Sequence, residues 1–382
     1  MLTMKKSGII TFHGPKFVFF GSGAAARIPR GNAVVSPSVY RHFTALIKNI
    51  DPDPVLFSRA SSTGEPCEED ILKLAGVLRK KIKSSPDLPV IAVGGGSVID
   101  GVKLALCIAA CPGLTFEKIY NEGIPRGNYP RLIAAETTSG TGTAVTSVAV
   151  VTKKDNVKRG VVSPYLIPDE AYYDSDFIAS LPEDVFASSA MDALTHAVEA
   201  YVSAIENIPA DTMALKAAEM LGKNVLAGYK GSVSAREQAH CGNMMAGQAF
   251  SNARLGLCHA LAHSIGGRFG VAHGRINAIL LPSVIDYNFP EAFEKYDRIA
   301  SSLGIAPGGL AENIRELNSK MGIDNSLSFL GAKFEAMIDD IAAEAAVSSL
   351  MAVNPRPAVN GKIAEFLRVL SKKGSGLDIR HC

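Results

Sequence analysis

Five side chains with the chemistry of metal ligands occur in the second half of the chain, four of them in two pairs at helical spacing. His259 and His263 are four residues apart, so a helix would place them on one face, one turn apart. His273 follows a glycine-containing turn and could fold back toward that face. Asp192 and His196 form an upstream pair with the same spacing. A lone histidine is more often a core or capping residue, but two matched pairs and His273 together predict a site for one divalent cation.

Two loops in the first half have the composition of phosphate- or ribose-binding segments. The first loop lies between an apolar run and a helix, where backbone N–H groups and the helix N-terminus favour an anion; its candidate residues are Gly94, Gly95, Gly96, Ser97 and Asp100. The second loop offers the hydroxyl groups of Thr137, Thr138, Ser139 and Thr141. Either loop alone could be a plain tight turn or a solvated loop. Two such loops at strand ends of one domain favour a nucleotide site.

The apolar pattern predicts two domains that position these sites. Strand-like segments alternate with helical ones in the first half, which indicates βαβ units and a parallel sheet. The expected strands lie near residues 16–20, 32–36, 55–58, 88–93 and 131–135, with a helix over 68–84 and a β-rich piece over 145–162. Beyond Leu181 the chain is mostly helical, with long periodic segments over 210–226, 236–250, 274–287, 291–303 and 333–351. The predicted domains are therefore residues 1–180 and 181–382, with a ligand cleft between them.

Size and composition exclude several classes of protein. A chain of 382 residues with 47% hydrophobic and 20% charged residues is typical of a two-domain globular protein without long disorder. The net charge of +2 gives no electrostatic case for nucleic acid, and no apolar run approaches the length of a membrane span. The basic start lacks a signal peptide's continuous apolar core. Six cysteines without CxxC spacing indicate a reduced, cytoplasmic protein.

Four motifs occur along the chain in one order. They are Gly94-Gly-Gly-Ser-x-x-Asp100, Thr137-Thr-x-Gly-Thr-Gly, Asp192-Ala-Leu-x-His-Ala-x-Glu199, and Gly256-Leu-x-His-x-x-x-His with His273-Gly. Together they resemble the iron-containing (group III) alcohol dehydrogenase family, and the likeness covers nearly the whole chain. The resemblance implies an α/β, Rossmann-like dinucleotide-binding domain with a parallel sheet, followed by an all-α domain, in a dehydroquinate synthase-like architecture.

The resemblance also assigns roles to the candidate site residues. It implies that the metal ligands are Asp192, His196, His259 and His273. His263 matches a histidine near the substrate and the nicotinamide, so it is expected to act in catalysis and not as a ligand. The two glycine- and hydroxyl-rich loops match the family's contacts to the pyrophosphate and the nicotinamide ribose, and Lys158 matches a lysine near the ribose.

Some positions depart from the family pattern. Many NAD-preferring members carry an aspartate after the second strand, where this chain has Val35-Ser-Pro37-Ser38. The choice between NAD and NADP is therefore open. Glu136 replaces a usual proline and Ala144 a usual glutamate, and neither position is expected to do chemistry.

Three arginines flank the metal-binding histidines in an otherwise apolar stretch. Arg254, Arg268 and Arg275 could hold a substrate with an anionic tail, because a guanidinium binds a carboxylate or phosphonate in bidentate fashion. The alternative is that they pair with acidic residues of their own domain, face the cofactor phosphates or line a subunit interface. Phe250 is a further candidate substrate contact.

The predicted function is an NAD(P)-dependent, divalent-metal-dependent alcohol dehydrogenase or aldehyde reductase. The metal, Fe²⁺ or alternatively Zn²⁺, would polarise the carbonyl of a small aldehyde, and the nicotinamide would deliver the hydride. Two other functions stay open: a lyase of the dehydroquinate synthase type that uses NAD and a metal, and a non-enzymatic metal- or nucleotide-binding protein. We expect a homodimer or higher homo-oligomer, with no nucleic-acid or membrane partner.

Overall fold

A six-stranded parallel sheet forms the centre of the N-terminal region. The computed structural model describes residues 10–58, 65–154, 158–357 and 359–372. Within them the sheet has the strand order β1-β8-β5-β4-β2-β3, and every pairing is parallel. The strands are β1 (Phe17–Phe20), β2 (Asn32–Val35), β3 (Val55–Leu56), β4 (Val90–Gly94), β5 (Leu132–Glu136) and β8 (Glu170–Tyr173).

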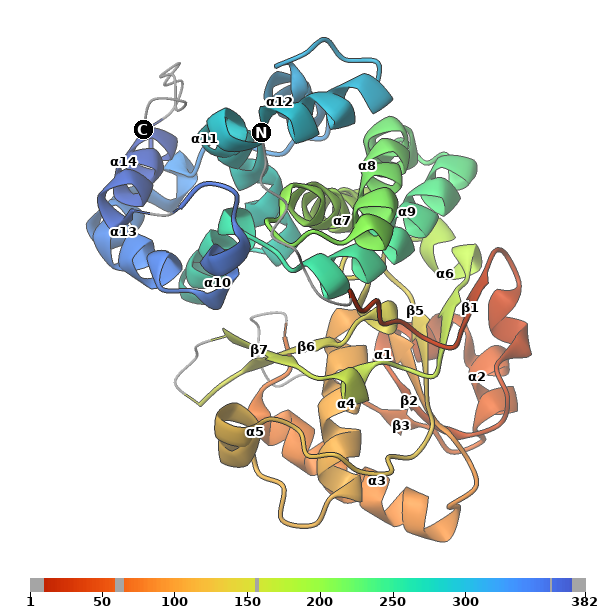
Figure 1. Ribbon diagram of the computed structural model, residues 1–382. Coiled ribbons are helices and arrows are strands. Elements are labelled where there is room, and N and C mark those ends of the chain that lie inside the picture. Colours follow the sequence, from red (N-terminus) through yellow and green to blue (C-terminus); the bar gives the residue numbers. More distant parts are fainter. Residues whose placement is uncertain (1–9, 59–64, 155–157, 358, 373–382) are drawn as a thin grey trace.

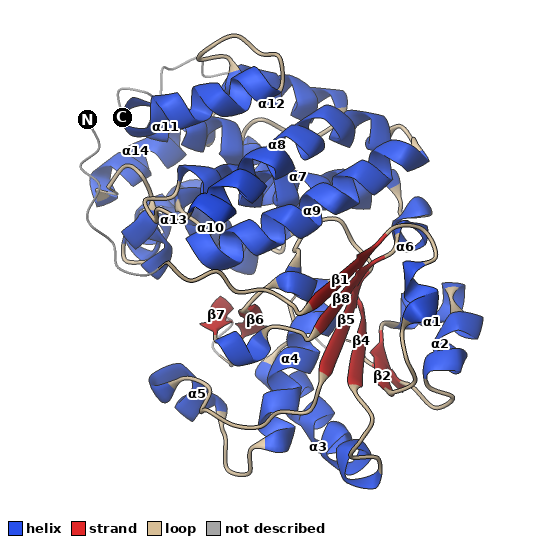
Figure 2. Cartoon of the chain, turned by 45° about the vertical axis from the view of Figure 1, so that its right-hand side comes forward, coloured by secondary structure: helices blue, strands red, loops and turns tan. Residues whose placement is uncertain are grey.

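Helices cover both faces of this sheet (Figure 2). Ala92 of β4 belongs to the apolar cluster under the helices α3 (Glu68–Ser84) and α4 (Gly96–Ala110). Its neighbours Ile91 and Val93 belong to the cluster on the other face, with α1 (Pro37–His42), α2 (Thr44–Ile50) and α6 (Ser175–Ala179). Because successive side chains of a strand point to opposite faces, a strand buried on both faces reads as a continuous apolar run. The parallel sheet and its helices are therefore the α/β arrangement that the sequence pattern predicted.

Two strands lie outside the main sheet, and one main strand escaped prediction. β6 (Val148–Thr152) and β7 (Lys158–Val162) form an antiparallel ribbon, which accounts for the β-rich piece. β8 was not predicted, although it lies between β1 and β5 in the sheet. It has only four residues and begins with the polar Glu170, so it lacks the long apolar run by which β4 was found. A short helix, α5 (Phe116–Glu122), precedes β5.

The C-terminal region is a bundle of helices around α7 (Figure 1). Its helices are α7 (Glu183–Val202), α8 (Ile208–Tyr229), α9 (Val233–Ala253), α10 (Leu257–Phe269), α11 (His273–Ser302), α12 (Leu310–Lys320), α13 (Gly331–Ala346) and α14 (Asn360–Leu370). From Ala190 to Val202 every residue of α7 is buried, so this helix is the core of the bundle. In the described residues no helix is both long enough and apolar enough to cross a membrane. The predicted fold class, α/β followed by helices, is confirmed.

One helix boundary differs from the sequence prediction, and one predicted break lies inside α11. The expected helix over 333–351 ends at Ala346, and a separate 3-10 turn begins after Ser348, whose hydroxyl accepts a hydrogen bond from the Leu350 N–H. The segments expected over 274–287 and 291–303 correspond to the two helical parts of α11, which are separated by a kink with non-helical backbone angles at Ala292. Pro290 lies two residues before that kink and removes a helical N–H donor, which explains why the sequence suggested a break there.

The carboxyl ends of the parallel strands face the helical region (Figure 2). Helix α9 lies against the loop after β5 so closely that a Cβ on Gly247 would stand 2.6 Å from the carbonyl oxygen of Gly142. The buried Arg236 of α9 donates hydrogen bonds to the carbonyl oxygens of Ile178 and Leu181, and so fixes the connection between the two regions. The boundary between residues 180 and 181 stays a prediction.

Candidate active site

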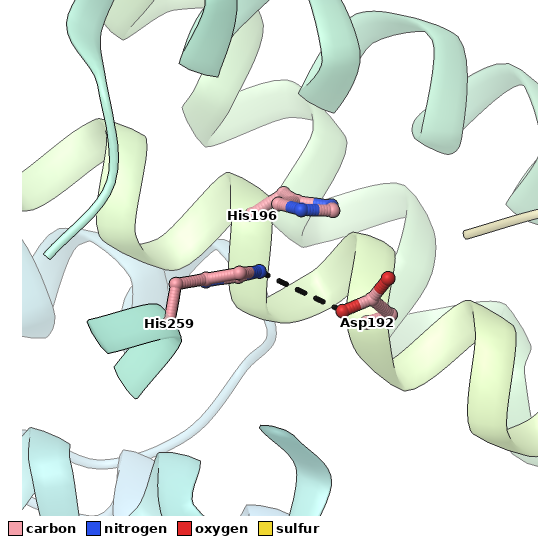
Figure 3. Close-up of side chains that lie close together, drawn as sticks. All are labelled: Asp192, His196 and His259. Carbon is pink, nitrogen blue, oxygen red and sulfur yellow. Dashed lines mark ion pairs between the residues drawn. The ribbon is translucent and has the colours of Figure 1, made fainter. Parts of the chain in front are cut away.

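Three of the predicted metal ligands converge in the helical region (Figure 3). Asp192 and His196 lie one turn apart on α7, and His259 faces them from α10. One donor atom from each of the three lies within 4.8 Å of the others, and all three residues are buried. The Nε2 atom of His259 is 3.6 Å from Oδ1 of Asp192. The i, i+4 spacing predicted from the sequence therefore corresponds to a real cluster of donor atoms.

His273, the fourth predicted ligand, joins the cluster from the first residue of α11. Its Nε2 atom lies 3.8 Å from Oδ1 of Asp192. The chain reaches this position through a turn at Gly270, which adopts a left-handed φ of 65°. Gly274 allows the close approach of α11 to α7, because a Cβ there would lie 2.2 Å from the carbonyl oxygen of Ser188.

Glu199 positions His259 and was given no role by the sequence. Its carboxylate accepts a hydrogen bond of 2.6 Å from Nδ1 of His259 and one of 2.7 Å from the N–H of Cys258. The first contact leaves Nε2 of His259 directed toward Asp192, and an outer carboxylate of this kind commonly orients a metal-binding imidazole. Burial opposes the charged form of His259, but Asp192 and Glu199 outweigh it and raise the pKa of His259 to about 9. Glu199 follows Asp192 by seven residues, two helical turns, and this spacing could have identified it.

The side-chain amide of Asn277 marks the point on which three of the donor atoms converge. Its Nδ2 atom lies 2.6 Å from Oδ1 of Asp192 and 3.1 Å from Nε2 of both His259 and His273. Three acceptor atoms that face one proton donor are also arranged to face a cation. The chemistry of this donor set, imidazole nitrogens with one carboxylate, suits a divalent transition metal. The residues therefore fit the metal that the sequence predicted.

The ionisation of the cluster agrees with this donor set. Burial lowers the pKa of His196 to about 4 and that of His273 to about 3, so both are neutral imidazoles near pH 7. Burial also opposes ionisation of Asp192, but His196, His273 and His259 outweigh it and hold its pKa well below the usual range. A carboxylate and neutral imidazoles are the protonation states that bind a metal, so Asp192, His196 and His273 are ready for it, whereas His259, whose pKa is raised, would release a proton on binding.

His263 lies beside the cluster, one turn after His259 on α10. Its ring stacks on that of His273 with a centroid distance of 5.2 Å and meets His259 edge-on at 6.1 Å. The side chain is partly exposed, yet it is enclosed closely enough that desolvation lowers its pKa well below the usual value. A neutral imidazole has one donor and one acceptor nitrogen, so His263 can pass a proton without holding a charge.

The two predicted cofactor loops lie side by side at the ends of β4 and β5. The N–H of Thr137 donates to the carbonyl oxygen of Gly94, and Gly96 is the first residue of α4. Gly95 and Gly96 face the side chains of Thr138 and Thr141, so a larger residue at either glycine would collide with them. The carboxyl edge of a parallel sheet and a helix N-terminus are where this class of fold binds dinucleotides.

Three predicted cofactor residues are held by protein contacts at this edge. Asp100 accepts hydrogen bonds from the Thr143 hydroxyl and from the N–H of Val150, so its two oxygens hold the turn after the second loop and strand β6. Ser139 is hydrogen-bonded to Nδ1 of the buried His240 on α9. Lys158 forms an ion pair of 2.6 Å with Glu65.

Lys158 approaches the histidines from the N-terminal region, with Glu65 as its partner. The Lys158 side chain is only 2% exposed. Its ammonium lies 3.7 Å from the Cβ position of Gly266 on α10, one turn beyond His263. Its charge also contributes to the lowered pKa values of His263 and His273. Glu65 was not predicted, because a single glutamate in a loop carries no recognisable pattern.

The predicted substrate contacts fall into two groups. Arg268 pairs with Glu344 at 2.6 Å, and Arg275 pairs with Asp324 at 2.7 Å. Arg254 is an exposed residue at the end of α9 with a positive φ of 69°. Arg268 and Arg275 therefore follow the alternative stated above, in which the arginines pair with acidic residues of their own domain. Phe250, in contrast, stacks on the ring of His196 with a centroid distance of 4.4 Å, and so borders the metal cluster.

Comparisons with known proteins identify the class to which this fold and site belong. Residues 15–175 match the model of the iron-containing alcohol dehydrogenase family, and residues 186–370 match the model of that family's C-terminal part. The chain belongs to the iron-containing alcohol dehydrogenase family. The predictions of an alcohol-type oxidoreductase, and of NAD(P) with a metal as its cofactors, are confirmed at the level of this family.

Individual relatives agree with this assignment over most of their length. The NADPH-dependent butanol dehydrogenase of Clostridium saccharobutylicum is 35% identical over 324 residues, which cover 81% of this chain and 79% of that protein. The structure of an iron-containing alcohol dehydrogenase from Thermococcus thioreducens is similar with a TM-score of 0.83 and 30% identity, over 95% of this chain and 99% of that one. A 1,3-propanediol oxidoreductase has a TM-score of 0.84 and 28% identity, over 94% and 99% of the two chains.

Proposed function

We propose that this protein interconverts a short aldehyde and its primary alcohol, using NAD(H) or NADP(H) and one divalent metal. The observation that carries the proposal is the convergence of Asp192, His196 and His259 beside the loop that follows β5, where Nδ1 of His196 lies 3.2 Å from the carbonyl oxygen of Gly140. Asp192, His196, His259 and His273 would hold the metal. Iron(II) is expected from the family, and zinc is the alternative because the donor set accepts both.

The chemistry divides between the bound groups and the side chains. The metal would supply Lewis-acid polarisation of the carbonyl, and the nicotinamide would supply the hydride. Glu199 keeps His259 in one tautomer and orientation through the bond to Nδ1. His263, which is partly exposed beside His273, would carry the proton between the substrate oxygen and solvent.

A neutral substrate agrees best with the charges around the cluster. The guanidinium groups of Arg268 and Arg275 are paired with carboxylates, and Lys158 is neutralised by Glu65. An anionic tail would therefore find these three cations already paired, and Arg254, the remaining predicted contact, is exposed at the end of α9. The names of the butanol dehydrogenase and the 1,3-propanediol oxidoreductase among the relatives also favour short neutral alcohols.

The adenosine end of the cofactor site supports the use of both cofactors. After β2 the chain continues with Ser36, Pro37 and Ser38, and Ser36 caps α1 by accepting a hydrogen bond from the Val39 N–H. This segment carries no carboxylate that would repel a 2′-phosphate.

The test is net turnover by the metal-loaded protein. Butanal or propanal should be reduced while NADH or NADPH is consumed in equal amount, and chelation should abolish the reaction. A lyase of the dehydroquinate synthase type would show no net consumption of the nicotinamide cofactor. A protein that binds metal and cofactor but converts neither aldehyde nor alcohol would contradict the proposal.

A further inference from the structure

A carboxylate is buried directly beneath the two cofactor loops. Glu136 is the last residue of β5, is fully buried, and pairs in the sheet with Gly94, where the glycine loop begins. The hydroxyl-rich loop starts at the next residue, Thr137. Glu136 therefore lies at the junction of the two loops, although the sequence suggested no role for it.

Glu136 holds the hydroxyl-rich loop at three points. One carboxylate oxygen accepts hydrogen bonds from the hydroxyl groups of Thr138, at 3.2 Å, and Thr141, at 3.0 Å. The other oxygen accepts the N–H of Ala144 at 3.1 Å. A single side chain thus fixes the loop near its start, its middle and its end.

The two threonines that Glu136 holds also pack against the glycine loop. A Cβ on Gly95 would lie 3.0 Å from the Thr138 methyl group, and a Cβ on Gly96 would lie 2.7 Å from the Thr141 methyl group. The threonine methyl groups therefore pack against the glycines, while their hydroxyl groups point to Glu136. If the threonines turned, the backbone that precedes α4 would lose this support.

The surroundings of Glu136 explain how a carboxylate is accommodated there. Burial raises the pKa of Glu136 to about 7, against the three hydrogen bonds that favour the ionised form. The buried ammonium of Lys103 lies near enough for Glu136 to raise its pKa, although burial lowers it overall to about 8. Burying a carboxylate is costly unless hydrogen bonds compensate it, and here the compensation comes from the three bonds to the loop.

The contacts from α9 would survive the loss of Glu136. Asn243 donates to the carbonyl oxygen of Thr138 at 3.4 Å, and His240 is 3.0 Å from the hydroxyl of Ser139. These bonds hold the same loop from the helical region. Removal of Glu136 should therefore disturb the face turned to the glycine loop more than the packing between the regions.

We infer that Glu136 is a positioning residue for the nicotinamide cofactor: it orients Thr138 and Thr141, and through them the Gly95–Gly96 turn that would receive the pyrophosphate. The inference rests on the proposed function, since it assumes that NAD(P) binds at these loops. Glu136 need not touch the cofactor, because it acts through the two threonines. The expected effect is thus on cofactor affinity, with the metal cluster unchanged.

The experiment compares Glu136→Gln with Asp51→Asn. Asp51 is a matched control: it is also buried, and it accepts the N–H of Ala33 at the opposite end of the sheet from the cofactor loops. Dissociation constants of NADH and NADPH are measured by nicotinamide fluorescence on metal-loaded protein, together with metal content, melting temperature and kcat at saturating cofactor. Glu136→Gln should raise both dissociation constants at least tenfold, with metal content unchanged and kcat within threefold. Asp51→Asn should lower the melting temperature and leave the dissociation constants within twofold of the wild type.

Two outcomes would overturn the inference. One is a Glu136→Gln protein that is folded and binds both cofactors within twofold of the wild type; the other is an Asp51→Asn protein that weakens binding as much. If Glu136→Gln does not fold, Thr141→Val tests the same link, since it removes one hydroxyl that Glu136 holds, and unchanged binding would count against the inference. A wild-type protein that binds neither cofactor would instead contradict the proposed function, so the two failures can be told apart.

Discussion

The metal cluster and the cofactor loops differ in which part of the chain forms the binding site. In the helical region, each donor is a side chain fixed on a long helix, and Asp192 and His196 need only the helical repeat to share a face. In the α/β region, the predicted cofactor loops are rich in glycine, and buried carboxylates such as those of Glu136 and Asp100 hold the surrounding chain by accepting hydrogen bonds from the protein itself. Replacing one side chain should therefore reduce metal binding and activity strongly in the helical region, and cofactor affinity more moderately in the α/β region.

The largest effect is expected from His259→Ala in the helical region. This change removes a predicted ligand and leaves Glu199 without its partner, so metal content should fall far below one per chain, and kcat should fall by about a thousandfold or more. Metal analysis and steady-state kinetics measure the two effects, and the exposed His42→Ala is the control. Normal metal content and normal rate in His259→Ala would refute its assignment as a ligand.

A smaller effect is expected from His263→Ala, one turn away on the same helix. Loss of a proton relay should lower kcat by about ten- to a hundredfold, while metal content remains that of the wild type. The two histidine variants thus distinguish a role in metal binding from a role in proton transfer. If His263→Ala loses the metal instead, His263 is a ligand and its stacking on His273 has a different purpose.

The same contrast explains how far sequence reasoning reached. Asp192, His196, His259 and His273 could be predicted because they recur in motifs, and helical spacing alone places the first two on one face. Glu199 was within reach of the same argument. Glu65 and Glu136 were not, because each acts through contacts that only the packed structure creates, Glu65 with Lys158 within the N-terminal region and Glu136 with a loop that folds back over it. β8 was missed for a similar reason, since its place depends on its neighbours β1 and β5.

In the α/β region, Ser38→Asp should shift cofactor preference by about tenfold toward NADH. An aspartate near the end of β2 would accept a hydrogen bond from the adenosine ribose and repel a 2′-phosphate. The wild type is expected to discriminate between NADH and NADPH by less than about a thousandfold, or roughly 4 kcal/mol. Measured kcat/KM values for both cofactors test this, with Ser38→Asn as the uncharged control. An equal shift in the control would show that charge is not the cause.

The smallest expected effect is a change in the pH dependence of stability. The pKa of Glu136 is raised in the folded protein from 4.5 to about 7, so its contribution to stability is complete below about pH 4.5 and is lost as the pH rises through 7. The wild type should therefore lose stability relative to Glu136→Gln over this range, by on the order of 1 to 3 kcal/mol. Asp100, Lys103, Tyr173 and His240 surround this site in both proteins, so only the part of their titration that depends on Glu136 itself enters the difference. Denaturant unfolding at pH 5, 6, 7 and 8 measures the difference, and parallel curves would contradict the assignment.

Anomalous diffraction from crystals grown with Co²⁺ or Zn²⁺ and NAD(H) tests most directly whether the two regions form one site. One anomalous peak per chain should lie among Asp192, His196, His259 and His273, with cofactor density running from the Gly94–Ser97 loop toward that peak. A peak bound by His263 in place of His273, or a cofactor bound away from these loops, would contradict the account.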